Sequence, residues 1–167
     1  TIPALFYGAM PNLALYSQPD GPCPNPMDLL PQGKLAEGKA SFEEAVEYAV
    51  KDMVYVGSEM YETGADGINF DTTGAAGDAE FLAALKAAEI LRKKYPKIGI
   101  EMGMASEFIL GLHGELEYDG VRLAGLYPHD QVRLAQKAGV NIFGPAINIV
   151  TNKSTPFNLA RSVTFTK

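Results

Sequence analysis

The chain has 167 residues, 47% of them hydrophobic and 20% charged, which are the proportions of one ordinary globular domain with a hydrophobic core. Fourteen basic against twenty acidic side chains give a net charge of −6, which argues against nucleic acid or an anionic membrane as a partner, because both bind clustered lysine and arginine. The single cysteine, Cys23, excludes an internal disulfide and a multi-cysteine metal site and favours a cytoplasmic setting.

The first predicted element is a buried strand over Ile2–Gly8, a short apolar run without the basic start of a signal peptide. Residues 9–40 are rich in glycine and proline and predict a long loop, of the kind that serves as a lid or binding loop. A helix is then expected to begin at Ser41, with Glu44 completing a capping box, and to end at Gly64.

A second strand is predicted over Gly67–Asp71, followed by a glycine-rich turn, Thr72–Gly77. A helix with Gly77 or Asp78 as its cap follows and cannot pass Pro96. The third strand covers Ile98–Glu101.

The remaining pattern predicts a short helix at 105–112, a hairpin at 116–123, a helix at 128–139, a strand at 140–143 and a helix from Thr155 that is still running at Lys167. No apolar run approaches the roughly 20 residues that span a bilayer. Because the chain begins like the middle of a strand and stops within a helical pattern, we expect it to be part of a longer polypeptide.

Alternation of short apolar strands with helices predicts an α/β fold with a parallel sheet and right-handed crossovers. An open doubly wound sheet and a (β/α)8 TIM-type barrel both fit, since four units make a small open sheet or half of a barrel of about 250 residues. The turn Thr72–Gly77 lacks the G-x-G-x-x-G pattern and a Walker lysine, so it does not favour a nucleotide-binding sheet. The pattern leaves both folds open.

Reactive residues in either fold belong at the carboxyl ends of strands. Glu101, directly after Ile-Gly-Ile, is the strongest candidate, since a carboxylate in a barrel mouth binds a cationic amine or exchanges protons; the alternative is a structural ion pair. Asp71 orients a substrate, acts as a base, or only caps its turn. Further candidates for substrate binding are Tyr7, Asn12, Asn69, His113 and Asn148.

The two histidines, His113 and His129, have no H-E-x-x-H or other metal-ligand spacing, and each also fits a plain loop or helix-cap position. No metal site is therefore predicted. There is also no G-x-S-x-G elbow and no Ser-His-Asp order that would indicate a hydrolase.

Four stretches resemble the dimethylamine:corrinoid methyltransferases, and the similarity runs from the first strand to the last helix. They are Phe-Tyr-Gly-Ala-Met-Pro-Asn (6–12), Gly-Ala-Asp-Gly-Ile-Asn-Phe-Asp-Thr-Thr (64–73), Gly-Leu-His-Gly-Glu-Leu-Glu-Tyr-Asp-Gly-Val (111–121) and Ala-Gly-Val-Asn-Ile-Phe-Gly-Pro (138–145).

The resemblance implies a (β/α)8 barrel in which residues 1–167 supply about four β/α units of a longer catalytic domain. It also implies transfer of a methyl group from dimethylamine to the Co(I) corrinoid of a separate partner protein, in methanogenesis or methylotrophy. No corrinoid is then bound by this chain directly, and the long loop before residue 40 lies where the partner docks. Methanogen members use pyrrolysine to hold the amine; this sequence has none, and the resemblance places it beyond Lys167. A barrel carboxylate close to the amine maps onto Glu101.

Two other functions remain open. A different barrel enzyme, such as a lyase or decarboxylase acting on a small acid, would want lysine or arginine at the strand ends, where this chain carries Asp, Glu and Asn. A non-catalytic half-barrel used for assembly is the other alternative. Since half a barrel exposes two sheet edges, we expect a homo-oligomer.

Overall fold

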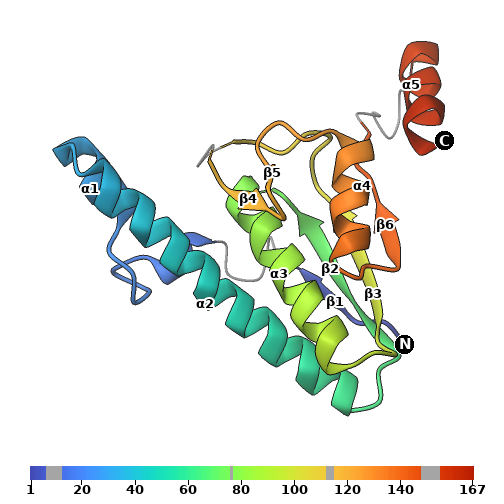
Figure 1. Ribbon diagram of the computed structural model, residues 1–167, viewed down its shortest axis with the longest axis horizontal. Helices are drawn as coiled ribbons and strands as arrows, with labels where there is room; N and C mark the ends of the chain where they lie inside the picture. The colour runs from blue at the N-terminus through green and yellow to red at the C-terminus, as the bar shows by residue number, and fades with distance from the viewer. Residues whose placement is uncertain (7–12, 76, 112–114, 148–154) are drawn as a thin grey trace.

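The computed structural model describes residues 1–6, 13–75, 77–111, 115–147 and 155–167. A four-stranded parallel sheet carries helices on one face, and a small hairpin lies beside it (Figure 1). The strands are β1 (Ala4–Phe6), β2 (Gly67–Thr73), β3 (Gly99–Met104), β4 (Glu117–Tyr118), β5 (Val121–Arg122) and β6 (Ile142–Gly144). The helices are η1 (Leu13–Tyr16), α1 (Pro26–Leu29), η2 (Leu30–Gln32), α2 (Leu35–Glu62), α3 (Asp78–Lys94), α4 (Pro128–Lys137) and α5 (Pro156–Thr166).

The sheet confirms the predicted parallel arrangement. Its order is β1-β2-β3-β6, and every neighbouring pair is parallel. This order follows the chain, whereas a doubly wound sheet reverses its order at the binding crevice. Because right-handed crossovers in one direction return on the same side, α2, α3 and α4 gather on one face (Figure 1). The described strands are therefore singly wound.

The hydrophobic core lies between this face of the sheet and the helices. Every second residue of β2 and β3 points into it, and these side chains are almost completely buried: Ile68, Phe70, Ile100 and Met102. The helices contribute Met53, Phe81, Leu85 and Leu91. Burying a side chain of this size stabilises the fold by about 1.5–3 kcal/mol, so this one layer holds the sheet against α2 and α3.

The start of α2 differs from the prediction. The helix begins at Leu35, and Ser41 lies inside it, 2% exposed, with its hydroxyl donating to the Pro24 carbonyl. Ser41 is therefore not the cap, and the capping box with Glu44 is wrong. The preceding residues are mostly strong helix formers, and the weak one, Gly38, packs closely: a Cβ there would lie 3.0 Å from Leu30 Cδ2.

The long loop predicted over 9–40 is also wrong over its described part. Residues 13–34 contain η1, α1 and η2, and both η1 and α1 pack on α2. The Tyr16 hydroxyl donates to Asp52 of α2 at 2.7 Å, and its ring lies 6.0 Å from that of Tyr48. Cys23 is completely buried. This segment is thus part of the folded body, because its apolar residues find a partner surface that no local pattern reveals.

The short helix predicted at 105–112 is absent from 105–111, which instead form bends. Their backbone pairs with a later loop: Ile109 donates to the Leu126 carbonyl at 3.1 Å and accepts from Gly125 at 2.8 Å. The hairpin is confirmed as β4 and β5, with both turn residues, Asp119 and Gly120, at positive φ. Long-range hydrogen bonds therefore outweigh helix propensity before the hairpin.

Two buried side chains, Tyr16 and Cys23, and the partly buried Tyr118 predict a loss of stability at alkaline pH. Burial and the hydrogen bond to Asp52 raise the pKa of Tyr16 well above its usual range. Burial and the hydrogen bond to Glu89 raise the pKa of Tyr118 in the same way, and burial raises that of the Cys23 thiol. The unfolded chain then binds fewer protons than the folded one, so the free energy of unfolding falls as pH rises above about 9–10.

Urea titrations between pH 8 and 11 measure how steeply the free energy of unfolding falls with pH. We expect Tyr118→Phe to make this dependence shallower, because the variant lacks the phenol at position 118 while Tyr16 and Cys23 still titrate. Tyr55→Phe, which changes a tyrosine 66% exposed, should leave it as in the parent. Equal slopes in all three proteins would show that Tyr118 does not contribute.

Candidate active site

The face of the sheet opposite the helices carries the polar residues. Successive side chains of a strand point to opposite faces, so the alternates of the buried apolar residues lie on the other side. In β2 these are Asn69 and Asp71, and in β3 they are Glu101 and Gly103, all partly buried. No helix of the described part of the chain covers them. We call this surface the open face.

Asn69 and Glu101 are adjacent on the open face. They are register partners in the β2–β3 pairing, which places their backbones about 4.8 Å apart with both side chains on one side. Across β3, Glu101 is also the register partner of Ile142, which is 53% exposed. The carboxylate thus has an amide on one side and an apolar side chain on the other.

Neither side chain uses its polar atoms within the described structure. The Asn69 Oδ1 atom is buried and has no hydrogen-bond partner among the described residues. No ion pair of these residues involves Glu101, so the alternative of a structural ion pair finds no partner there. A buried acceptor without a donor costs about 1–3 kcal/mol, and a ligand that brings N–H groups recovers that cost.

Asp71 lies one layer nearer the carboxyl ends of the strands. Its Oδ1 atom accepts from the backbone N–H of Thr72 at 2.7 Å, and Thr72 has a φ of 54°. Asp71 therefore stabilises its own turn, which was the alternative to a functional role in the sequence analysis. It also belongs to the open face. Its carboxylate lies over Gly103 of β3, where a Cβ would come within 3.0 Å of Oδ1.

The glycine opposite Asp71 was not among the predicted site residues. Its signal was available, since Gly103 follows Glu101 by two positions and shares its face. We expect Gly103→Ala to push the Asp71 carboxylate aside and lower activity by about tenfold, with a loss of stability of about 1 kcal/mol. Gly144→Ala is the matched control, because a Cβ at that position meets nothing closer than 3.8 Å. Steady-state kinetics and thermal unfolding of both variants test this, and equal activities would remove Asp71 from the site.

Within the described ranges, the structure brings no other predicted site residue to the open face. Tyr7, Asn12, His113 and Asn148 lie outside the described residues. His129 is described: it lies in the first turn of α4, is half exposed, and places Nε2 3.2 Å from the Asp130 carboxylate. It belongs to the helix layer and not to the open face.

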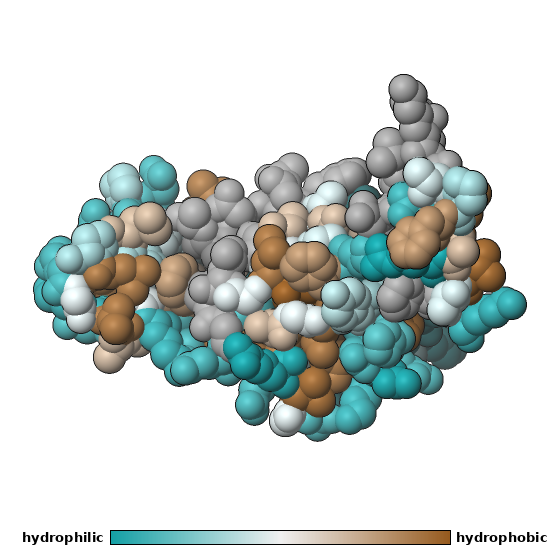
Figure 2. All heavy atoms as spheres, turned by 90° about the horizontal axis from the view of Figure 1, so that it is seen from above, coloured by the Kyte–Doolittle hydropathy of each residue, from teal (hydrophilic) through white to brown (hydrophobic). Residues whose placement is uncertain are grey.

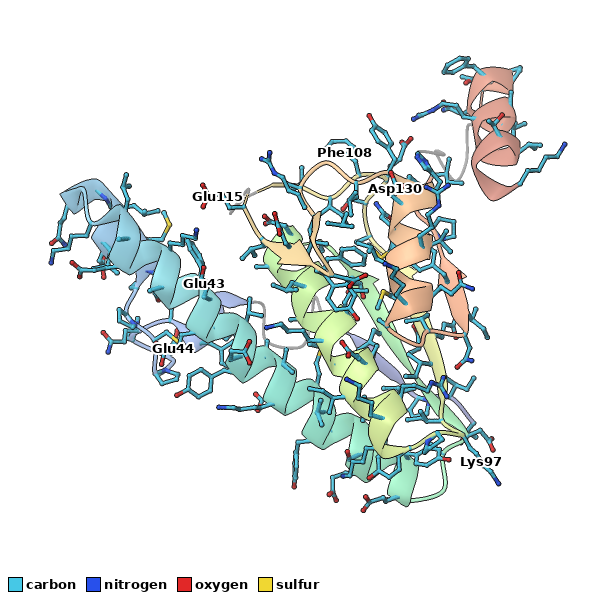
Figure 3. All side chains as sticks on the ribbon, in the orientation of Figure 1. Glu43, Glu44, Lys97, Phe108, Glu115 and Asp130 are labelled. Carbon is cyan, nitrogen blue, oxygen red and sulfur yellow. The ribbon has the colours of Figure 1, made fainter. Side chains whose placement is uncertain are left out.

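A groove of about 490 Å³ on the helix side is a separate feature. Its lining is acidic and comes from α2, α3 and the segment at β4, including Glu43 and Glu115 (Figure 3). Lysines neutralise part of this charge: Lys86 lies 2.5 Å from Glu47, and Lys39 lies 2.5 Å from Glu115. No residue of the groove belongs to the sheet, so it is not the site assembled at the strands.

Within the described ranges, no three His, Cys, Asp or Glu side chains gather as metal ligands. A search of the same residues for helices long and apolar enough to cross a bilayer also finds none.

The open face offers two carboxylates, an amide and glycine backbone. This surface is rich in hydrogen-bond acceptors and poor in donors, so it suits a small cation with N–H groups.

The family model for dimethylamine methyltransferase matches residues 1–167, so both the helix layer and every residue of the open face fall within it. No solved structure matches the chain.

Proposed function

Since the chain belongs to the dimethylamine methyltransferase family, we propose that its open face binds dimethylamine and presents it for methyl transfer to the Co(I) corrinoid of a partner protein. The observation that carries the proposal is a pair of register neighbours in the sheet. Among the described residues, the Glu101 carboxylate has no paired cation and the Asn69 Oδ1 acceptor has no donor.

We propose further that the singly wound sheet belongs to a (β/α)8 barrel whose interior is the open face. Helices on one side and polar residues on the other support this, as does the exposed apolar surface at the β6 edge and on α5. Ile142 and Val132 are exposed at this edge, and Phe157 is 71% exposed on α5, which stands apart from the sheet (Figure 1). Seen from the end where the strands finish, apolar patches interrupt the polar surface (Figure 2). Further β/α units of a barrel would cover such surface.

Charge and shape of the open face fit a methylated amine. An alkylamine, like a lysine side chain, is protonated at neutral pH. Glu101 supplies the opposite charge, and Ile142 supplies an apolar contact for a methyl group. Keeping the nitrogen protonated also matters for the reaction, because the electron pair of the breaking C–N bond then leaves on neutral methylamine.

The corrinoid supplies the nucleophilic Co(I) centre that accepts the methyl group. One layer above Glu101, the Asp71 carboxylate lies over Gly103 and accepts from the backbone N–H of its own turn at Thr72. The chain's part is to bind, orient and keep protonated the amine, while a pyrrolysine beyond this sequence would complete the site.

The test uses the full-length protein from its natural source, mixed with its corrinoid partner. We expect dimethylamine to change the cobalt spectrum and to yield methylamine in equal amount, and the intact mass to exceed that of 167 residues. If neither the spectrum nor the amine changes, the methyltransferase proposal is wrong. A lyase or decarboxylase finds no support on the open face, where β2 and β3 carry Asp71 and Glu101 instead of cations.

A further inference from the structure

We propose that Asn69 determines amine specificity by accepting the second N–H bond of a secondary ammonium ion, so that the site distinguishes dimethylamine from trimethylamine. This inference rests on the proposed function and adds a role that neither the family nor the carboxylate provides, since a negative charge attracts all methylammonium ions.

The first observation is the unused acceptor. Asn69 Oδ1 is buried and has no donor among the described residues. It sits in the middle of β2, which pairs on both sides, with Ala4 of β1 and Glu101 of β3 as its register neighbours. The amide oxygen is shielded from solvent in this position, so a ligand with N–H groups is a natural source of its donor.

The second observation is geometric. Two tetrahedral N–H bonds, each about 2.8 Å from its acceptor, require acceptor atoms about 4.6 Å apart. Residues directly opposite on neighbouring strands are separated by about 4.8 Å. The parallel register of Asn69 and Glu101 therefore starts the two side chains at a backbone spacing close to the acceptor separation that one ammonium nitrogen needs.

Selectivity follows from counting N–H bonds. Dimethylammonium has two, one for the Glu101 carboxylate and one for Asn69 Oδ1, which leaves its methyl groups to the apolar side at Ile142 and to the reaction. Trimethylammonium has one N–H bond, so its third methyl group would face the buried oxygen. A site built to hydrogen-bond a substrate N–H rejects an analogue without it much more strongly than an apolar pocket rejects an extra methyl group.

The experiment compares kcat/KM for dimethylamine and trimethylamine in the full-length protein with its corrinoid partner. We expect the parent to prefer dimethylamine by about a hundredfold or more. Asn69→Leu, which keeps the shape and removes the acceptor, should lower kcat/KM for dimethylamine by about a hundredfold and leave trimethylamine unchanged or improved. Asn69→Asp keeps an acceptor at the same place and should preserve the preference.

The possible outcomes separate this inference from the proposed function. Equal loss for both amines in Asn69→Leu would make Asn69 a structural residue and overturn the inference while leaving the proposed function intact. Equal use of both amines by the parent would overturn it without any variant, even if Asn69→Leu failed to fold. A parent that demethylates neither amine would overturn the proposed function, and this inference with it.

Discussion

Replacing Glu101 by glutamine is expected to lower kcat/KM for dimethylamine by about a hundredfold or more. The substitution keeps the size of the side chain and removes its negative charge. Of the two open-face carboxylates in the described residues, Asp71 is hydrogen-bonded within its own turn, whereas Glu101 is not. Removing one partner of a buried charge pair costs about 2–5 kcal/mol, and each 1.36 kcal/mol is tenfold. Since the loss affects binding and the protonation of the leaving amine, both KM and kcat should change.

The stability of the same variant separates the two interpretations of Glu101. No ion pair of the described residues involves this carboxylate, so thermal unfolding of Glu101→Gln should match that of the parent. A structural ion pair would instead make the variant unstable. Glu117→Gln, an exposed carboxylate on β4, is the matched control and should keep full activity. Parent-like kinetics in Glu101→Gln would remove it from the site.

Replacing Phe70 by alanine is expected to lower the free energy of unfolding by about 3–5 kcal/mol. Phe70 is completely buried in the core face of β2, between the two open-face residues Asn69 and Asp71. The substitution leaves a cavity where the sheet meets the helices, and the close packing there allows only partial collapse.

Chemical denaturation of the variant measures this loss, and Phe157→Ala is its matched control. Phe157 is the same residue type, 71% exposed on α5, and its replacement should change stability by less than about 0.5 kcal/mol. A small effect at Phe70 would mean that the core does not lie on this face, and the assignment of the open face would then be wrong as well.

Local sequence signals predicted the elements whose limits depend on a few neighbouring residues. Gly64 and Gly139 adopt positive φ just beyond helices, and Gly77 precedes α3 as its cap. These positions follow from backbone sterics, because glycine lacks a Cβ and adopts positive φ readily, and a glycine is visible in the sequence. The apolar run directly before Glu101 is similarly local, so Glu101 could be chosen as a candidate before any strand was paired.

Elements that depend on distant partners were missed. The early start of α2 rests on Gly38 packing against Leu30, and the missing helix at 105–111 rests on hydrogen bonds between Ile109 and a loop beyond the hairpin. Propensity is a weak prior in such segments, since a buried backbone group takes whichever partner the tertiary structure offers.

The candidate site also combines features that are visible in the sequence with features that depend on distant partners. The sequence alone showed that Asp71 and Glu101 follow apolar runs. The prediction that they end their strands was wrong, because β2 runs on to Thr73 and β3 to Met104. Only the tertiary structure decided that Asn69 stands beside Glu101, that Gly103 makes room for Asp71, and that all of them share the face without helices. Strand order and register are set by packing between segments far apart in the chain, and a slip of one residue would turn every one of these side chains to the opposite face.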